Sequence, residues 1–151
     1  MNRDRLASDL ILDEEVRLVV YDDKTGKSLR TGDTLQGNAT IGVGRNLHEP
    51  LSEAAWRFLL NESIETVLAD IDRACHWFDA LDDVRQRAVV NMVFNLGLPR
   101  FLNFKKTIAA IERGDWQIAA IEALDSTWAQ QVGARATRIA GMLRTGTDPE
   151  T

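Results

Sequence analysis

The stretch "DVRQRAVVNMVFNLG", residues 83–97, decides how this chain folds. Its apolar spacing predicts a helix from about Asp82 to Leu96, and Gly97 is a natural residue just past a helix end. From Ala88 to Leu96 the apolar residues occupy almost every side of that helix. We therefore expect it to be the central buried helix of the fold.

Helical patterns continue on both sides of this segment. Ser52 is a good N-cap for a long helix from Glu53 to about Cys75, with one apolar stripe along it. Three shorter helices are predicted on the C-terminal side, at about Leu102–Glu112, Asp115–Ala123 and Gly133–Leu143. Nothing in the pattern indicates an internal repeat or a linker between autonomous domains.

The N-terminal part has a different character. The segment from Asp4 to about Val16 has helical spacing, with Asp4 as its expected N-cap. The β-branched and aromatic run Arg17–Tyr21 predicts a strand, turn signals follow it, and Ala39–Gly44 predicts a second strand. The predicted fold class is therefore α+β and mostly helical: a small hairpin-containing N-terminal lobe, a long helix, and a helical C-terminal lobe.

Composition bounds the function. The chain has 151 residues, the size of one domain, and a formal charge of −5, which gives a nucleic acid no bulk electrostatic attraction. Cys75 is the single cysteine, so no intrachain disulfide can form. The N-terminus lacks a signal-peptide pattern, and no apolar run reaches membrane-spanning length. These features predict a protein made in a reducing compartment, without a membrane anchor.

The motif search excludes several chemistries. His48 and His76 have no neighbouring ligand at metal-binding spacing, so no metal site is expected. The glycines of "GVG" are not followed by the third glycine of a dinucleotide fingerprint, and no phosphate loop or nucleophile elbow is present. We expect no cofactor.

Acidic residues crowd the segment "LDEEVRLVVYDD", residues 12–23. Glycosidic bonds are broken by two carboxyl groups on different local elements, and Glu14 and Asp23 meet that requirement. Thr40 lies in "ATIGVG", where two glycines in the same strand leave room near its hydroxyl, which can donate to a carboxylate and accept from a water. From spacing alone, a solvated charge cluster and an ordinary strand threonine are the more frequent explanations.

Taken as an ordered set, the motifs resemble the phage-type lysozymes, the muramidases of the T-even bacteriophage family. The resemblance covers about residues 10–147, a single lysozyme-like domain with lobes at about 13–60 and 76–147 and the first helix packed on the second lobe. It rests on these segments: "LDEEVRLVVYDD", "ATIGVGRNL", "VRQRAVVNMVFNLG", "STWAQQVGARATR" and "RTGT".

The resemblance implies hydrolysis of the β-1,4 bond between N-acetylmuramic acid and N-acetylglucosamine in peptidoglycan, in a cleft between the lobes. By motif, Glu14 matches the general acid, seven residues before Tyr21, and Asp23 matches the second carboxylate, two residues after it. Thr40 matches the threonine of Thr-Ile-Gly. Such enzymes invert the anomeric centre, so Asp23 is expected to act as base on a water that Thr40 helps to hold.

Further positions follow from the same resemblance. Asn46 and Phe94 match substrate-contacting positions, and Arg135 in "GARAT" matches the arginine that pairs with the catalytic glutamate. Asn91 is expected to support the structure near the cleft. Arg45 replaces the histidine common after Ile-Gly-x-Gly.

The partner of that histidine in the family corresponds to Glu62, so an Arg45–Glu62 ion pair is our hypothesis. Glu15 stands where the family has glycine, and the link between Asp23 and Thr40 is long, which predicts an extended hairpin. Phe104 and Glu122 depart from the family at two contact positions, so no role is carried over to them.

Two other interpretations remain open. A lytic transglycosylase would use one acid and form an anhydro sugar end without Asp23. An inactive glycan-binding module or a virion component would need no Glu14, Asp23 and Thr40 together. For the hydrolase we expect a peptidoglycan glycan strand as partner, no nucleic acid, and a monomer. It would accumulate in the host cytoplasm, depend on a separate holin-type pore to reach the wall, and lyse the host at the end of a phage cycle.

Overall fold

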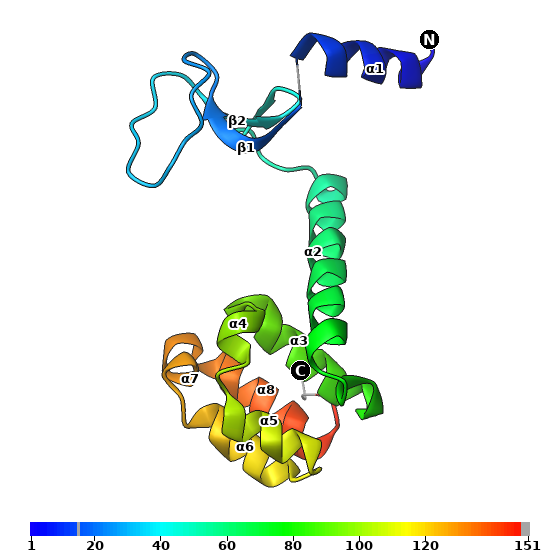
Figure 1. The fold of residues 1–151 in the computed structure, drawn as a ribbon, viewed down its shortest axis with the longest axis vertical. Coiled ribbons are helices and arrows are strands. Elements are labelled where there is room, and N and C mark those ends of the chain that lie inside the picture. The colour runs from blue at the N-terminus through cyan, green and yellow to red at the C-terminus, as the bar shows by residue number, and fades with distance from the viewer. Residues whose placement is uncertain (15, 149–151) are drawn as a thin grey trace. The chain divides into compact units, whose positions relative to one another are not determined.

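The computed structural model describes residues 1–14 and 16–148, apart from the side chains of Asp9 and Glu14. The chain divides into two compact units, Met1–Ala55 and Trp56–Thr151, and each is described here by itself (Figure 1). The first holds one helix and a small antiparallel sheet, and the second is wholly helical. The predicted class, α+β and mostly helical, is confirmed. None of the described helices is long and apolar enough to cross a bilayer.

Helix α1 spans Arg3–Glu14. Its first turn is capped by Asn2, whose side-chain oxygen accepts a hydrogen bond from the amide of Arg5 at 3.0 Å. The prediction that Asp4 is the N-cap is wrong, because Asp4 already lies inside the first turn. Leu6, Leu10 and Ile11 on this helix are exposed.

Three short strands form an antiparallel sheet in the order β1 (Arg17–Asp22), β2 (Ala39–Gly42) and β3 (Arg45–Asn46). The predicted single strand over 39–44 is divided in two, because Gly42 and Gly44 adopt φ of 68° and 69° and turn the chain back on itself.

The long link between β1 and β2 first runs back along the free edge of β1. The amide of Leu29 donates to the carbonyl of Val20 at 2.9 Å, and Ser28 forms a bridge with Tyr21. The link then crosses the end of β1 to reach β2 on the opposite edge. The predicted extended hairpin is therefore a tight turn followed by a wide loop.

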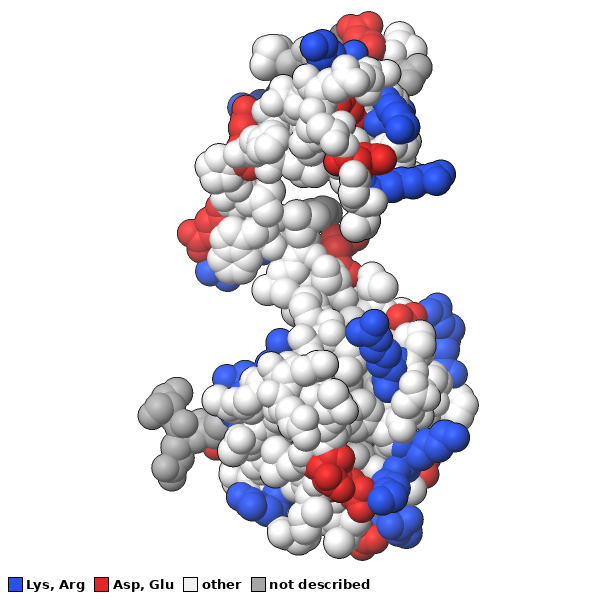
Figure 2. Space-filling view, turned by 90° about the vertical axis from the view of Figure 1, so that its left-hand side faces the viewer, with Lys and Arg blue, Asp and Glu red and all other residues white. Residues whose placement is uncertain are grey.

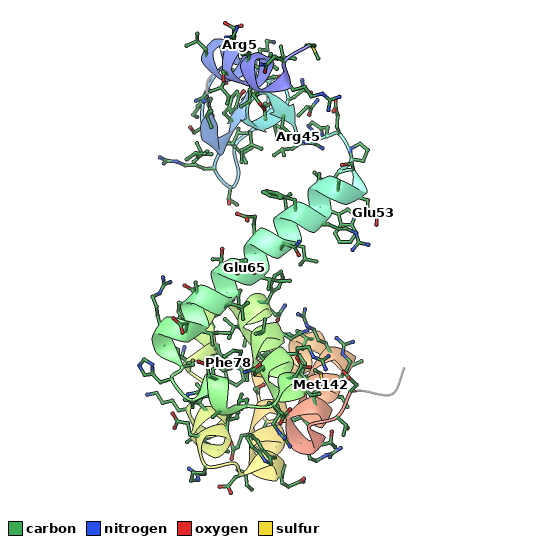
Figure 3. All side chains as sticks on the ribbon, turned by 90° about the vertical axis from the view of Figure 1, so that its right-hand side faces the viewer. Arg5, Arg45, Glu53, Glu65, Phe78 and Met142 are labelled. Atoms are coloured by element: carbon green, nitrogen blue, oxygen red, sulfur yellow. The ribbon has the colours of Figure 1, made fainter. Side chains whose placement is uncertain are left out.

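Helix α2 (Glu53–Ala74) begins as predicted after Ser52, whose hydroxyl accepts from the amide of Ala55 at 3.2 Å. Among its residues only Ile71 is fully buried. In Figure 3 the part of α2 that precedes Glu65 extends away from the other helices of its unit. Within this unit, the half-buried and buried residues of α2 lie from Ile64 onward.

Helix α3 (Asp83–Leu96) is the centre of the helical unit, as predicted. Asp82 caps it by accepting from the amide of Arg85, and Gly97 ends it with a φ of 74°. Helix α8 (Ala134–Thr145) packs beside α3 (Figure 1). The fully buried residues of α3 face the core: Ala88, Val89, Met92 and Val93.

Four further helices complete the unit: α4 (Leu98–Phe101), α5 (Lys105–Glu112), α6 (Trp116–Leu124) and α7 (Thr127–Val132). The predicted helix over 102–112 therefore begins only at Lys105, and the short helix α4 before it was not predicted. Helix α7 was not predicted, although Ser126 caps it by accepting from the amide of Ala129 at 3.1 Å. A single 3₁₀ turn, Phe78–Ala80, connects α2 to α3.

The side chain of Arg85 joins three helices of this unit. Its guanidinium pairs with Asp82, donates to the carbonyl of Leu143 at 2.8 Å, and stacks 4.1 Å from the ring centroid of Trp116. Only 12% of the side chain is exposed. A buried cation held by charge-assisted bonds and an aromatic face contributes more than a surface ion pair.

We expect Arg85→Ala to lower the free energy of unfolding by about 2–4 kcal/mol, since it removes these contacts and leaves the Leu143 carbonyl unpaired. Urea denaturation followed by circular dichroism measures the loss. The matched control is Arg73→Ala, whose exposed pair with Asp70 is worth about 0–1 kcal/mol. Equal losses in the two variants would contradict a joining role for Arg85.

Candidate functional site

Asp23 lies immediately after β1, and its carboxylate is held by one residue. The backbone amide of Asn38 donates to Asp23 Oδ1 at 2.7 Å, and the Asn38 side-chain nitrogen donates to Oδ2 at 2.9 Å. The Asp23 amide in turn donates to the carbonyl of Asn38 at 3.0 Å. Each carboxylate oxygen keeps lone pairs for one more donor, and Asp23 is exposed.

Thr40 belongs to the same cluster. It stands opposite Tyr21 across β1 and β2, it is only 3% exposed, and its hydroxyl donates to the carbonyl of Asn38 at 3.2 Å. From its residue type, this hydroxyl could donate to a carboxylate. The structure directs its proton to Asn38 instead, so the lone pairs of Oγ1 are left to accept a hydrogen bond.

The hydrogen bonds from Asn38 stabilise the ionised form of Asp23. The backbone amide of Asn38, and then its side chain, lower the pKa of the Asp23 carboxyl, while partial burial and the neighbouring Asp22 charge pull in the opposite direction. The net pKa lies below the usual value, so Asp23 is ionised at neutral pH. An ionised, exposed carboxylate is suited to accept a proton.

Asn38 and Asp22 are the site residues that sequence reasoning missed. Gly37-Asn38 was noted only as a turn signal, and Asp22 only as a member of the acidic run. Asp22 is 2% exposed, and its carboxylate accepts hydrogen bonds from four backbone amides. The sequence offered one signal for Asp22, the pair of successive aspartates. Because successive residues of a strand face opposite sides, one of the two was expected to point inward.

Asn46, expected to contact substrate, lies in β3 opposite Thr40. Its side-chain oxygen accepts from the amide of His48 at 2.9 Å and so holds the turn after β3. The amide nitrogen of its side chain keeps its donors. The substrate role stays a prediction.

For Glu14, Arg45 and Glu62, the described structure shows none of the predicted partners. Glu14 is the last residue of α1, and its side chain lies outside the described residues, as does Glu15. Arg45 donates to the carbonyl of Pro50 at 3.2 Å. Because Arg45 and Glu62 belong to different units, their ion pair stays a prediction.

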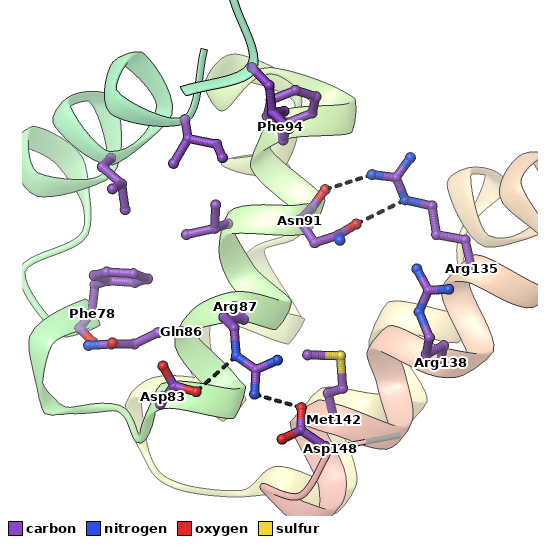
Figure 4. A pocket seen from close by; sticks show the side chains of 14 residues that line it. Phe78, Asp83, Gln86, Arg87, Asn91, Phe94, Arg135, Arg138, Met142 and Asp148 are labelled. Atoms are coloured by element: carbon purple, nitrogen blue, oxygen red, sulfur yellow. Dashed lines mark hydrogen bonds and ion pairs between the residues drawn. The ribbon is translucent and has the colours of Figure 1, made fainter. Parts of the chain in front are cut away.

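In the helical unit, Asn91 and Phe94 of α3 and Arg135 of α8 line one hollow of about 670 Å³ (Figure 4). Asn91 holds Arg135: its side-chain oxygen accepts from Nε at 2.9 Å, and its carbonyl accepts from Nη2 at 3.4 Å. Phe94 is 43% exposed at the rim. Further apolar walls come from Leu60, Ile64, Leu68, Phe78, Val90 and Met142.

The far end of the same hollow is charged. Arg87 donates to Asp83 at 2.8 Å and to Asp148 at 2.7 Å, so the C-terminal segment is tied to α3 (Figure 4). These pairs raise the pKa of the Arg87 guanidinium further above its usual value, with Asp148 the larger cause. Arg138 also lines this end.

The two positions that depart from the family lie around a second hollow of the helical unit, of about 530 Å³. Phe104 meets Trp128 edge to face, with ring centroids 6.0 Å apart, and Glu122 pairs with Lys106 at 3.5 Å. The indole nitrogen of Trp128 donates to Asn95 at 2.8 Å. Aromatic and charged contacts therefore occupy both positions.

Within residues 1–14 and 16–148, no three His, Cys, Asp or Glu side chains are grouped so that they could hold a metal ion. Lys and Arg occur alongside Asp and Glu on the visible face of each unit (Figure 2).

We expect Asn38→Ala to raise the pKa of Asp23, because the side-chain donor that stabilises its ionised form is removed while the backbone amide remains. Titration of the Asp23 carboxyl carbon by NMR measures the shift. Asn103→Ala, an exposed asparagine of the helical unit, should leave that titration unchanged. An unaltered Asp23 titration in Asn38→Ala would show that the side-chain bond has no part in setting this pKa.

The phage lysozyme family matches residues 14–145. Probable T4-type lysozymes 1 and 2 of Dictyostelium discoideum are each 40% identical to this chain, over 67 and 70 residues, 44% and 46% of the chain. The matches span 39% and 41% of those relatives, so the chain covers about two-fifths of their length. The pre-baseplate central spike protein Gp5 of Enterobacteria phage T4 is 28% identical over 93% of this chain and 28% of its own length. The chain belongs to the phage lysozyme family.

Proposed function

We propose that this protein is a muramidase that hydrolyses the β-1,4 bond between N-acetylmuramic acid and N-acetylglucosamine in peptidoglycan, with inversion at the anomeric carbon. The observation that carries the proposal is the cluster of Asp23, Asn38 and Thr40, in which a carboxylate and a hydroxyl are held by one asparagine. Membership of the phage lysozyme family over residues 14–145 supports it.

In this mechanism one water is the nucleophile. Its two hydrogens are donated to an oxygen of Asp23 and to the free lone pairs of Thr40, which leaves its own lone pair for the anomeric carbon. As the water oxygen bonds to that carbon, Asp23 takes one proton. Asp23 is ionised at neutral pH, as the base must be before the reaction. Its lowered pKa makes it a weaker base than an ordinary aspartate, so its proposed role rests on its position beside the water.

Glu14 is the proposed general acid. It gives its proton to the leaving oxygen, the O4 of N-acetylglucosamine, as the glycosidic bond breaks. The product is a reducing muramic end in the α configuration, because water attacks the face opposite the leaving group. Arg135, with its guanidinium oriented by Asn91, is proposed to pair with Glu14. Phe94 and Asn46 are proposed to contact the sugars.

The biological setting is also a proposal. We propose a monomeric endolysin that collects in the host cytoplasm, reaches the wall through a separate holin-type pore, and lyses the host. The likeness to a phage spike protein over 93% of the chain favours a second setting, in which the same hydrolase acts as part of a virion. Both settings use the same bond cleavage.

Purified peptidoglycan digested with the wild-type protein should give reducing muramic ends, and Asp23→Ala should lower their rate of release by about 10²–10⁴-fold, since the base is removed. Mass spectrometry identifies the ends, and proton NMR identifies the first anomer formed. Asp33→Ala, an exposed carboxylate of the same loop, is the control. If Asp23→Ala stays active and releases anhydro sugar ends, the reaction is that of a lytic transglycosylase and the proposed hydrolysis is wrong.

Glu14→Gln should abolish clearing of cell walls while the unfolding transition stays unchanged, because the amide cannot supply the proton. Turbidity of a cell-wall suspension measures clearing, and circular dichroism measures folding. Asp13→Asn removes the neighbouring charge and serves as the control. Near-normal clearing by Glu14→Gln would remove Glu14 from the mechanism.

A further inference from the structure

Asp22 uses every polar atom to close the loop between β1 and β2. Its Oδ1 accepts from the amides of Lys24 at 3.0 Å and Thr25 at 3.1 Å, directly after the strand. Its Oδ2 accepts from the amides of Gln36 at 2.6 Å and Gly37 at 3.2 Å, where the loop returns. One buried carboxylate therefore holds both limbs of the loop.

The backbone of Asp22 is engaged in the same way. Its amide donates to the carbonyl of Lys27 at 3.0 Å, and its carbonyl accepts from the amide of Gly26 at 2.8 Å. With these bonds made, the polar atoms of Asp22 are all engaged within the loop, and none is left to bind a substrate. Any influence of Asp22 on a reaction must pass through its neighbours.

Those neighbours are the two members of the site. Asp23 follows Asp22 on one limb, and Asn38 follows Gly37 on the other. The two limbs lie so close that a Cβ added to Gly37 would meet the Lys24 amide nitrogen at 2.9 Å and would also meet Asp23 Oδ1. The carboxylate of Asp22 thus fixes the separation across which Asn38 binds Asp23.

We propose that Asp22 is a positioning residue of the site: its buried carboxylate clamps residues 36–38 against the end of β1 and so sets the place and basicity of Asp23. This inference rests on the proposed hydrolase function. It assigns Asp22 no contact with sugar or water.

Charge is essential to the clamp. An ionised carboxylate accepts from all four amides, whereas an asparagine has one oxygen and presents an NH₂ group to the other two donors. The bond from Gln36 lowers the pKa of Asp22 most, and those from Gly37, Thr25 and Lys24 add to it, although burial raises it. Because the folded pKa is lowered, the clamp is complete above the unfolded value of about 3.9 and is lost as pH falls through the folded pKa.

The test compares Asp22→Asn with Asp33→Asn, a control whose exposed carboxylate accepts one amide, that of Arg30, in the same loop. We expect Asp22→Asn to lower kcat on soluble peptidoglycan fragments by about 10–100-fold with KM changed by less than about threefold, as for a displaced catalytic group. The acidic limb of its pH profile should move to higher pH, because Asp23 loses donors. A wild-type kcat and pH profile in Asp22→Asn would overturn the proposal.

A second measurement separates this inference from the hydrolase proposal. In Asp22→Asn, the amide of Asn38 should exchange its hydrogen faster and the NMR titration of Asp23 should shift upward, whether or not the wild type cleaves peptidoglycan. If the wild type is inactive and these shifts occur, the function fails and the clamp stands. If neither shift occurs, the clamp fails.

Two further variants keep the test valid if Asp22→Asn does not fold. Asp22→Glu retains the charge but displaces the oxygens by one methylene. Gly37→Ala leaves the Asp22 side chain unchanged and pushes the returning limb outward, because its methyl group would meet the Lys24 amide nitrogen and Asp23 Oδ1. Both should lower kcat and raise the pKa of Asp23. An unaltered pKa of Asp23 in both folded variants would overturn the positioning role.

Discussion

The burial of the Asp22 carboxylate is the constraint on which the small sheet depends. A charge removed from water must be satisfied locally, and here four backbone amides from both limbs of the loop satisfy it. If either limb withdrew, a buried charge would lose half of its partners. The middle of the loop, around Arg30 and Gly32, is exposed. Because closure entropy grows slowly with length, a long loop whose ends are held in this way costs the sheet little.

Each unit orients a charged side chain with an asparagine. In the sheet, Asn38 donates to the anionic Asp23, and in the helical unit Asn91 accepts from the cationic Arg135. An amide side chain carries both donors and an acceptor, so it fixes a carboxylate or a guanidinium without adding a charge of its own. An aspartate at position 38 would instead repel Asp23, and a lysine at 91 would repel Arg135. The two asparagines therefore position these groups without placing a like charge beside them.

The ends of the two long helices could be predicted from local signals, whereas the hydrogen bonds between distant residues could not. The ends of α2 and α3 follow from Ser52 and Gly97, because a cap acts on residues within one turn. From the spacing of Glu14 and Asp23 alone, a solvated charge cluster was the more frequent explanation. Only the resemblance of the ordered motifs to a known family made a catalytic pair the preferred hypothesis. The role of Asp22 was out of reach, since two of its donors come from residues 14 and 15 positions away.

The two adjacent aspartates differ because of how many donors each one meets. Asp22 and Asp23 carry like charges, and the charge of Asp22 acts to raise the pKa of Asp23. The bonds from Asn38 outweigh that repulsion, so both carboxylates stay ionised side by side. The carboxylate of Asp22 accepts hydrogen bonds from four amides and is buried, whereas that of Asp23 is held by Asn38 and remains exposed. Asp23 is therefore the carboxylate that is open to proton exchange, and Asp22 is the one that holds Asp23 in position.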